Sequence, residues 1–296
     1  MQKVTLPSLE DVGNIARAAG KLTTTYFRRE IQVDEKEGDL GLVTEADIAS
    51  ENFIKSEILK NFQGHVILGE ESGWSQSLQI GAASGHPLTS DLPSHADGTV
   101  LWIIDPIDGT TNFSKGNIYH CISIACGVVI NGQFSCKSAA IYQPGTEDLF
   151  TAAEEQGAWM NGRPMRVGAG SERRRWSITT GFSSNKGESL HGVIRCIEIM
   201  QNRVLGVRIN GAAALDLALT ASGIFNGFFE SRLSPWDMAA GELLVKEAGG
   251  LVVNYEGQRF DVLKDKNIVA GPEHVVEDML EMISSVKAEL RSSVWP

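Results

Sequence analysis

The stretch IIDPIDGTTNF at positions 103–113 carries the residues best suited to chemistry. An apolar run leads directly to Asp105, and the proline and glycine that follow force a turn that brings Asp108 back toward it. The two carboxylates then converge as hard oxygen ligands. The N–H groups of Gly109 and Thr110 would begin a short helix, whose positive dipole end suits a phosphate. Because carboxylates repel an anion, the pattern favours a divalent cation between them, and oxygen ligands favour Mg²⁺ over Zn²⁺.

Other interpretations of this motif stay open at this point. Aspartates beside proline and glycine commonly decorate a turn without any catalytic role. An EF-hand fits poorly, because its loop requires acids at the first, third and fifth positions and a glycine at the sixth. A pair of glycosidase carboxylates would need no helix start suited to a phosphate. The motif alone therefore does not decide between a simple turn and a metal site.

Three further segments place acids at element ends. In LGEESG, Glu70 and Glu71 follow a buried strand, and adjacent carboxylates repel each other unless a cation or solvent relieves them. In SPWDMAAGELL, a serine cap and a proline at the first helical position leave Asp237 in the first turn. In LVTEAD, Thr44 caps a helix and leaves Asp47 in its first turn. Solvation or helix capping would explain each acid taken singly.

Composition limits the kind of protein that carries these acids. The chain has 296 residues, 42% of them hydrophobic and 21% charged, which is enough apolar material for a sizeable core. Its formal net charge of −11 argues against a nucleic-acid or anionic-membrane surface. The first residues, MQKVTLPSLEDV, lack an apolar signal core, and no run approaches the roughly 18 apolar residues of a membrane helix. We expect no membrane partner and a cytoplasmic location, or an organelle if a presequence has been removed.

The cysteines indicate neither a zinc site nor a disulfide framework. None forms a CxxC pair, and the histidines show no finger spacing. Within the strand-like run at 120–130, Cys121 and Cys126 are separated by an odd number of residues and would point to opposite faces. We therefore expect free, reduced core cysteines at all four positions: Cys121, Cys126, Cys136 and Cys196.

Periodicity predicts the elements that position the acids. Helices are expected over 8–28, 44–62, 188–201, 212–222, from 235 onward, and 272–291. Strands are expected over 65–69, 99–105, 120–130, 134–142, 148–153, 157–167, 177–182, 204–209, 224–230 and 267–271. The segments 31–42 and 73–99 lack periodicity and are expected to be loops.

The order of these elements predicts a mixed α/β (α+β) fold. Successive strands after residue 99 indicate an antiparallel sheet portion, and helices and strands alternate again beyond about residue 175. We expect a single catalytic unit over 1–296 with two lobes. The lobe at about 1–175 carries the metal and phosphate motifs, and the lobe at 176–296 supplies Asp237.

Together, WIIDPIDGTTNF at 102–113, PWDMAAGELLVKEAGG at 235–250, LGEES and LVTEAD resemble the motifs of the inositol monophosphatase family. Members are Mg²⁺-dependent, lithium-sensitive phosphomonoesterases. The resemblance extends from the first helix to the last strand. It implies a layered αβαβα sandwich of the inositol monophosphatase and fructose-1,6-bisphosphatase type, a small phosphorylated substrate and a homodimer.

The resemblance also implies the metal ligands. Glu70, Asp105 and the backbone carbonyl of Ile107 would bind one Mg²⁺, and Asp105, Asp108 and Asp237 would bind a second, so that Asp105 bridges the two. Glu70 would also help to hold a third, weaker ion or its water, which gives two to three ions per site. Two metals about 3.5–4 Å apart can stabilise both the attacking and the leaving oxygen of an in-line displacement.

Catalytic and phosphate-binding roles follow from the same resemblance. Thr110 and Asp47 match the pair that orients and deprotonates the attacking water, so the catalytic set is Asp47, Glu70 and Thr110. The peptide N–H groups of Gly109 and Thr110 would bind phosphate oxygens. Lys36, in the charged loop 34–43, could approach the site, but a solvated charge run is the preferred interpretation.

The alcohol part of the substrate is the least determined feature. Glu230 precedes Asp237 by seven residues and matches the acid that accepts a substrate hydroxyl in inositol-specific members, although strand-end acids are often simply exposed. The segment RINGAAALDLA matches the family's substrate-side segment, through Arg208, Gly211, Ala212 and Ala213. Ala212 stands where serine or threonine is common. His120 is expected to be a core or rim variation and not a catalytic base.

We therefore expect a phosphatase of small polyol phosphates, with inositol 1-phosphate as the leading substrate. Related enzymes cleave histidinol phosphate, 3'-phosphoadenosine phosphate, fructose 1,6-bisphosphate or NADP, and the motifs do not separate these substrates. No aromatic or basic stacking surface for a nucleotide is evident in the sequence. The alternative from another class is a non-enzymatic regulator that retains the fold.

Overall fold

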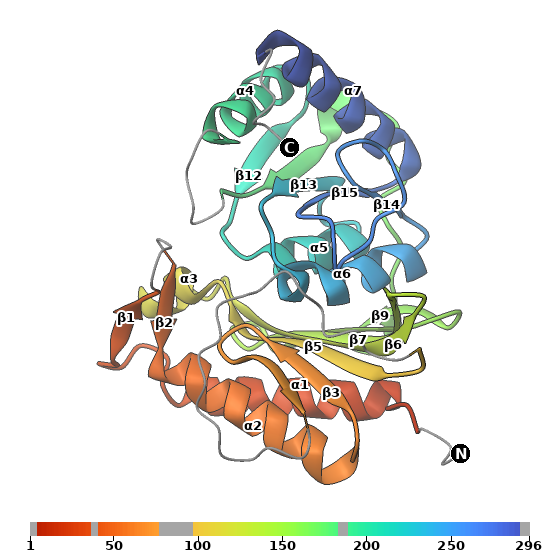
Figure 1. The fold of residues 1–296 in the computed structure, drawn as a ribbon. Coiled ribbons are helices and arrows are strands. Elements are labelled where there is room, and N and C mark those ends of the chain that lie inside the picture. The colour runs from red at the N-terminus through yellow and green to blue at the C-terminus, as the bar shows by residue number, and fades with distance from the viewer. Residues whose placement is uncertain (1–4, 37–40, 77–96, 183–188, 291–296) are drawn as a thin grey trace.

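The elements of the protein stack in five layers, helix, sheet, helix, sheet and helix, from bottom to top in Figure 1. The computed structural model describes residues 5–36, 41–76, 97–182 and 189–290. The bottom layer is α1 (Leu9–Thr24) with α2 (Glu45–Asn61), the middle layer α5 (Ala213–Ala221) with α6 (Pro235–Glu247), and the top layer α4 (Ser189–Gln201) with α7 (Glu273–Leu290). The expected αβαβα sandwich is confirmed.

The lower sheet has eight strands in the order β10-β9-β8-β7-β6-β5-β3-β4. Only β3 and β5 pair in parallel among these neighbours, so the predicted antiparallel portion is confirmed. The strands are β3 (Val66–Gly69), β4 (Gly73–Gln76), β5 (Val100–Asp108), β6 (Cys121–Ile130), β7 (Gln133–Gln143), β8 (Asp148–Ala153), β9 (Gly157–Met160) and β10 (Arg163–Pro164).

The upper sheet has five strands in the order β12-β11-β13-β15-β14. Strand β11 pairs in parallel with β12 and β13, and β15 pairs antiparallel with β13 and β14. The strands are β11 (Ser177–Thr180), β12 (Gly206–Ile209), β13 (Gly227–Ser231), β14 (Leu251–Val253) and β15 (Asn267–Gly271). A 3₁₀ turn, η1 (Arg173–Arg175), precedes β11. The predicted lobe boundary at about residue 175 lies in the interval between β10 and β11. The organisation of 1–296 as a single catalytic unit stays a prediction.

Two predicted loops are wrong in part. Within 31–42, β1 (Val33–Glu35) pairs antiparallel with β2 (Leu42–Thr44). Within 73–99, residues 73–76 form β4, which pairs with β3, and 77–96 lie outside the described residues. The strand at 251–253 was also not predicted. These strands have only three or four residues, too few to show an alternating pattern in sequence.

Apolar side chains fill the spaces between the layers. The lower core includes Val12, Ile15 and Ala16 of α1, which lie on one face of the helix and pack toward the lower sheet. A second apolar cluster lies around α5 and α6 of the middle layer. A third lies between the upper sheet and the helices α4 and α7. All four cysteines are buried and free, as predicted.

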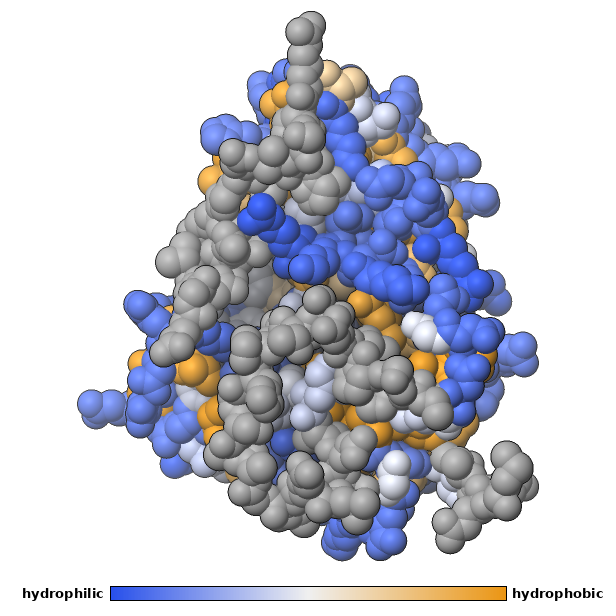
Figure 2. Space-filling model, viewed as in Figure 1, coloured by the Kyte–Doolittle hydropathy of each residue, from blue (hydrophilic) through white to orange (hydrophobic). Residues whose placement is uncertain are grey.

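Polar side chains cover much of the described surface on the face seen in Figure 2. Over the described ranges, no helix combines the length and apolar character needed to span a bilayer. The cytoplasmic location stays a prediction.

Candidate metal and phosphate site

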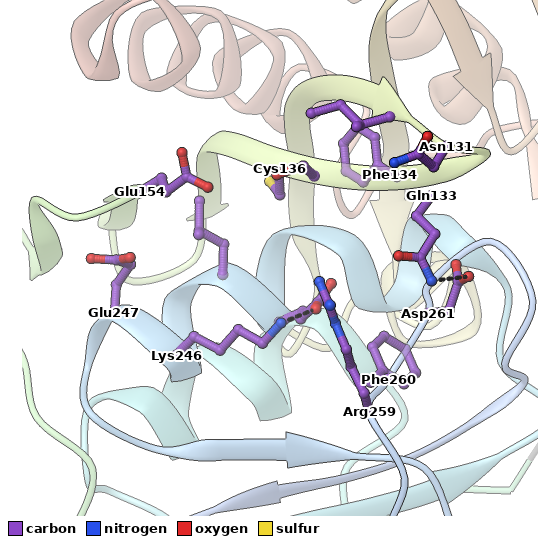
Figure 3. Close-up of a pocket in the computed structure, with 14 residues that line it drawn as sticks. Asn131, Gln133, Phe134, Cys136, Glu154, Lys246, Glu247, Arg259, Phe260 and Asp261 are labelled. Atoms are coloured by element: carbon purple, nitrogen blue, oxygen red, sulfur yellow. Dashed lines mark hydrogen bonds and ion pairs between the residues drawn. The ribbon is translucent and has the colours of Figure 1, made fainter. Parts of the chain in front are cut away.

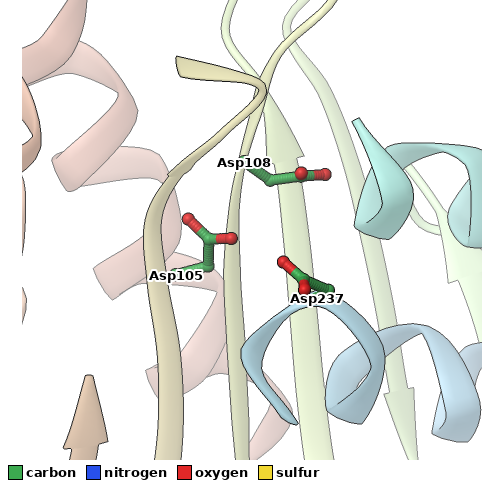
Figure 4. Close-up of side chains that lie close together, drawn as sticks. All are labelled: Asp105, Asp108 and Asp237. Carbon is green, nitrogen blue, oxygen red and sulfur yellow. The ribbon is translucent and has the colours of Figure 1, made fainter. Parts of the chain in front are cut away.

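Three aspartates converge where β5 meets the middle helix layer. Asp105 and Asp108 come from the end of β5, and Asp237 comes from the first turn of α6 and faces them in Figure 4. One carboxylate oxygen of each lies within 4.8 Å of those of the other two. The pairing of β5 with β6 shifts register between Asp105 and Asp108. This irregularity is the structural form of the predicted turn, and it lets two acids three residues apart face one centre.

Backbone N–H groups orient these three carboxylates. Asp108 accepts hydrogen bonds at Oδ2 from the N–H groups of Ala214 (2.8 Å) and Leu215 (3.3 Å), in the first turn of α5. Asp105 accepts one at Oδ1 from the N–H of Ile107 at 3.0 Å. Asp237 accepts one at Oδ2 from the N–H of Ser234 at 2.7 Å, which is the predicted cap of α6. The acids are therefore held in place before any ligand arrives.

Their electrostatics call for a cation. Burial raises the pKa of Asp105 well above its usual range, and Glu70, Asp108 and Asp237 raise it further. Burial raises the pKa of Asp108 to about 7, although the N–H groups of α5 oppose the shift. Burial and the Asp108 charge likewise raise the pKa of Asp237. Three ionised carboxylates this close need positive charge between them, and an oxygen-only set fits Mg²⁺.

Glu70 lies beside this trio, and its carboxylate forms an ion pair with the side chain of Lys36. Its N–H donates to the carbonyl of Ile104 on β5 at 3.3 Å, and its charge raises the pKa of Asp105. Lys36 Nζ lies 2.7 Å from Glu70 Oε1 and 2.9 Å from Glu71 Oε1. The preferred interpretation of Lys36 as a solvated charge is therefore wrong. The contact joins residues 34 positions apart through the β1–β2 hairpin, so no local pattern could indicate it.

The predicted catalytic pair is brought together. Thr110 Oγ1 lies 3.0 Å from Asp47 Oδ1 and 3.0 Å from the carbonyl oxygen of Ile107. Asp47 is fully buried, and the N–H of Thr44 donates to its Oδ2 at 2.8 Å, so it also caps α2 as predicted. Burial raises the pKa of Asp47 to about 6. Asp47 thus combines a capping contact with a direct contact to Thr110.

Gly109 shapes the turn after β5. It adopts φ 89° and precedes the short helix α3 (Thr110–Ser114), whose existence confirms the predicted helix start. A Cβ at Gly109 would lie 3.0 Å from the carbonyl oxygen of Tyr119 and 3.1 Å from the Cβ of Ala212. Both the backbone conformation and the close approach therefore require glycine.

The predicted substrate-side residues lie in three places. Gly211, Ala212 and Ala213 lead into α5 beside Gly109, and Gly211 has φ 79°. Glu230 on β13 is only 6% exposed, and its pKa is raised by burial and then by the charges of Asp216, Asp237 and Asp108. Arg208 on β12 is exposed, and its Nη1 donates to the neighbouring carbonyl of Val207 at 3.2 Å. The structure thus brings Gly211 to Ala213 to the turn and leaves Arg208 on the surface.

His120 is a core residue, as predicted. It is 2% exposed and packs against the rings of Phe27 and Phe113, with ring centroids at 5.1 and 5.0 Å. Burial lowers its pKa. Sequence reasoning missed Asp216, a carboxylate 1% exposed in the otherwise apolar run AALDLALTA. One acid inside an apolar helix was the signal that could have found it, because a buried carboxylate needs donors.

A cavity of about 420 Å³ lies elsewhere, between the β6–β7 turn and the C-terminal half of α6 (Figure 3). Its lining includes the Lys246–Glu242 ion pair and the hydrogen-bonded pair of Gln133 and Asp261. None of the acids described above lines it. The candidate functional site is therefore located by the carboxylate cluster and not by this cavity.

An αβαβα fold that carries an oxygen-only carboxylate cluster beside a glycine turn fits the class of metal-dependent phosphatases. The chain belongs to the inositol monophosphatase family, whose model matches residues 9–288. It is 37% identical over 275 residues to Nus factor SuhB of Escherichia coli strain K12, covering 93% of this chain and 94% of that protein. It is 36% identical over 269 residues to inositol-1-monophosphatase of Rhizobium meliloti strain 1021, covering 90% and 91%.

A solved structure gives the same result. The extragenic suppressor protein suhB from Bartonella henselae matches with a TM-score of 0.80 and 32% sequence identity, covering 93% of this chain and 97% of that one. The family is metal-dependent and comprises phosphatases, which agrees with the carboxylate cluster.

Proposed function

We propose that the protein is a Mg²⁺-dependent phosphomonoesterase that hydrolyses a small polyol phosphate, with inositol 1-phosphate as the leading substrate. The observation that carries this proposal is the trio of Asp105, Asp108 and Asp237 beside the hydrogen-bonded pair of Asp47 and Thr110. The Rhizobium meliloti relative, which is named inositol-1-monophosphatase, supports the choice of substrate.

In this proposal each metal ion has its own set of acidic ligands. Glu70, Asp105 and the carbonyl of Ile107 would hold one Mg²⁺. Asp105, Asp108 and Asp237 would hold a second, and Glu70 would help to hold a third. When bound, these ions supply Lewis-acid stabilisation of the phosphoryl oxygens and acidify water. Ionised acids in a buried cluster provide the negative charge that this binding requires.

The reaction then uses contacts that the chain already makes. The N–H groups of Gly109 and Thr110 orient the phosphate. Thr110 Oγ1, 3.0 Å from Asp47, takes a proton from the attacking water as its own proton passes to Asp47 Oδ1. A pKa near 6 suits Asp47 as the final acceptor at neutral pH, since it is ionised there and still basic. The hydroxide left from the water bonds to phosphorus as the phosphorus–oxygen ester bond breaks. The leaving alkoxide takes a proton from solvent water, and Asp47 returns its proton to solvent.

Glu230 provides the selectivity for a polyol. Its buried carboxylate is an acceptor for substrate hydroxyl groups, and burial, followed by the charges of Asp216, Asp237 and Asp108, raises its pKa. The site at Ala212 lacks the hydroxyl that is common in the family at this position. We therefore propose that hydroxyl recognition rests mainly on Glu230, with Gly211 and Ala213 as backbone contacts. Arg208, exposed on β12, contributes at the rim.

Phosphate release from a panel of substrates tests the proposal. The panel holds inositol 1-phosphate, histidinol phosphate, 3'-phosphoadenosine phosphate, fructose 1,6-bisphosphate and NADP, each with Mg²⁺, with EDTA and with added Li⁺. Selective turnover of inositol 1-phosphate that needs Mg²⁺ and falls with Li⁺ would support the full proposal. A preference for another compound would keep the mechanism and change the substrate. We also propose a homodimer, which light scattering of the purified protein would test.

The name of the Escherichia coli relative, Nus factor SuhB, favours a second candidate, a regulator that retains the fold and acts by binding. The clustered carboxylates argue for retained turnover, because unused buried acids would repel each other and destabilise the fold. A folded protein that releases no phosphate from any compound in the panel would favour this second candidate.

A further inference from the structure

Asp216 is a buried carboxylate to which the proposed reaction assigns no part. It lies in the first turn of α5 and is 1% exposed. Thr179 Oγ1 on β11 donates to its Oδ2 at 2.7 Å, and Asn210 Nδ2 donates to its Oδ1 at 2.8 Å. The hydroxyl of Tyr119 also donates to Oδ1. Three donors therefore satisfy a carboxylate that would be costly to bury alone.

The side chain of Asn112 closes a ring of hydrogen bonds around this acid. Its Nδ2 donates to the carbonyl oxygen of Tyr119 at 2.8 Å and to that of Asn210 at 2.8 Å. We call Tyr119, Asp216, Asn210 and Asn112 the inter-sheet ring. Tyr119 and Asn112 lie in the segment between β5 and β6 of the lower sheet, whereas Asn210 and Asp216 follow β12 of the upper sheet.

The inter-sheet ring borders the Gly109 turn, which is assigned to phosphate binding. An added Cβ at Gly109 would lie 3.0 Å from the carbonyl oxygen of Tyr119 and 3.2 Å from that of Gly211, which directly follows Asn210. Asp216 also follows the two N–H groups that hold Asp108. The ring therefore touches both the phosphate turn and the segment that leads into α5.

Tyr119 is the member of the ring whose contribution is easiest to isolate. Its hydroxyl makes the side-chain contact across the two sheets, while its backbone carbonyl is held separately by Asn112. Removing the hydroxyl leaves the ring's backbone contacts in place. It also removes the side-chain link between Asp216 and the segment that holds Tyr119, so the segment 210–216 is held less firmly beside the Gly109 turn.

We propose that Tyr119, acting through Asp216, is a positioning residue that holds the segment Asn210 to Ala213 against the Gly109 turn and thereby sets substrate affinity. The inference rests on the proposed function, because that segment carries the expected substrate contacts Gly211, Ala212 and Ala213. The residues that this inference adds are Tyr119 and Asp216, which act on the substrate site only through the segment 210–213.

Tyr119→Phe tests the proposal, with Tyr26→Phe as the matched control. Tyr26 is also half-buried, and among the described residues its hydroxyl has no hydrogen bond. For Tyr119→Phe we expect KM for inositol 1-phosphate to rise about tenfold while kcat stays within about twofold, which is the effect of losing one charge-assisted hydrogen bond. The control should change neither constant.

Hydrogen–deuterium exchange gives a readout that needs no turnover. We expect faster exchange of the amides at 210–216 in Tyr119→Phe, and no change there in Tyr26→Phe. Wild-type protein without phosphatase activity would overturn the proposed function, and the exchange result would still decide whether Tyr119 positions this segment. Unchanged exchange at 210–216, or a lower melting temperature with unchanged KM, would overturn the positioning role.

A second variant separates the ring from simple damage to the fold. Asp216→Asn should raise KM in the same direction. In the double variant the two effects should not multiply, because both changes weaken the same contact between Tyr119 and residue 216. Multiplicative effects would show that Tyr119 and Asp216 act independently and would contradict the proposal.

Discussion

Gly109→Ala probes the turn on which the phosphate site depends. Two separate penalties apply to this substitution. The residue adopts φ 89°, and a left-handed conformation costs a non-glycine residue about 1–2 kcal/mol. The new Cβ would also lie 3.0, 3.1 and 3.2 Å from Tyr119 O, Ala212 Cβ and Gly211 O, and overpacking of this kind costs about 1–3 kcal/mol. We expect a total loss of about 2–5 kcal/mol in unfolding free energy.

Gly64→Ala is the matched control for this experiment. Gly64 has φ 85°, close to that of Gly109, but an added Cβ there meets no atom of the described residues within 4 Å. The control therefore suffers the backbone penalty alone, and the difference between the two variants isolates the steric cost. Urea unfolding followed by circular dichroism measures both free energies, since small proteins lose stability linearly with denaturant.

Activity gives the second half of the prediction. Relief of the clash requires Gly211 and Ala212 to move away from the turn, so kcat/KM of Gly109→Ala should fall at least about a hundredfold while Gly64→Ala keeps wild-type activity. Equal stability of the two variants would refute the close approach around Gly109. A stable Gly109→Ala protein with full turnover would refute the role of this turn in the site.

Three other predictions follow from the same contacts. Because the folded pKa of Asp108 is raised to about 7, the metal-free protein binds more protons than the unfolded chain between about pH 4 and 7. In EDTA its melting temperature should therefore fall as pH rises through this window, and saturating Mg²⁺ should remove the fall. A flat profile in EDTA would contradict the charge repulsion. Lys36→Met removes the cation beside Glu70 and should tighten Mg²⁺ binding by about threefold in calorimetry, whereas weaker binding would show that Lys36 assists the metal. Gly20→Ala places a Cβ in steric overlap with the ring of Tyr142 and should lower the unfolding free energy by about 1–2 kcal/mol, despite the better helix propensity of alanine. A gain in stability would contradict this close packing.

The sequence predicted those features that depend on local pattern. The caps Thr44 and Ser234 fix where α2 and α6 begin, and therefore where Asp47 and Asp237 lie. The apolar run before Asp105 identified β5 and its acidic end. Such features can be predicted because the same few residues both encode the structure and carry the acid.

Features that depend on distant contacts could not be predicted in this way. The pairing of Lys36 with Glu70 requires the β1–β2 hairpin, whose three-residue strands have no periodic signal. The link from Tyr119 to Asp216 spans 97 residues and joins two sheets. Asp216 in α5 could have been predicted from the sequence to be a buried polar group. Its hydrogen-bond partners come from three other segments, so only the folded chain identifies them.

We propose that the clustered aspartates hold Mg²⁺ for phosphate ester hydrolysis. The decisive measurement is phosphate release from inositol 1-phosphate by the wild-type protein and by Asp108→Asn, each with Mg²⁺ and with EDTA. We predict turnover by the wild-type protein with Mg²⁺ only, and a loss of at least about a hundredfold in Asp108→Asn, with its circular dichroism spectrum unchanged. Undiminished Mg²⁺-dependent turnover by Asp108→Asn, or equal turnover by the wild-type protein in EDTA, would contradict the account.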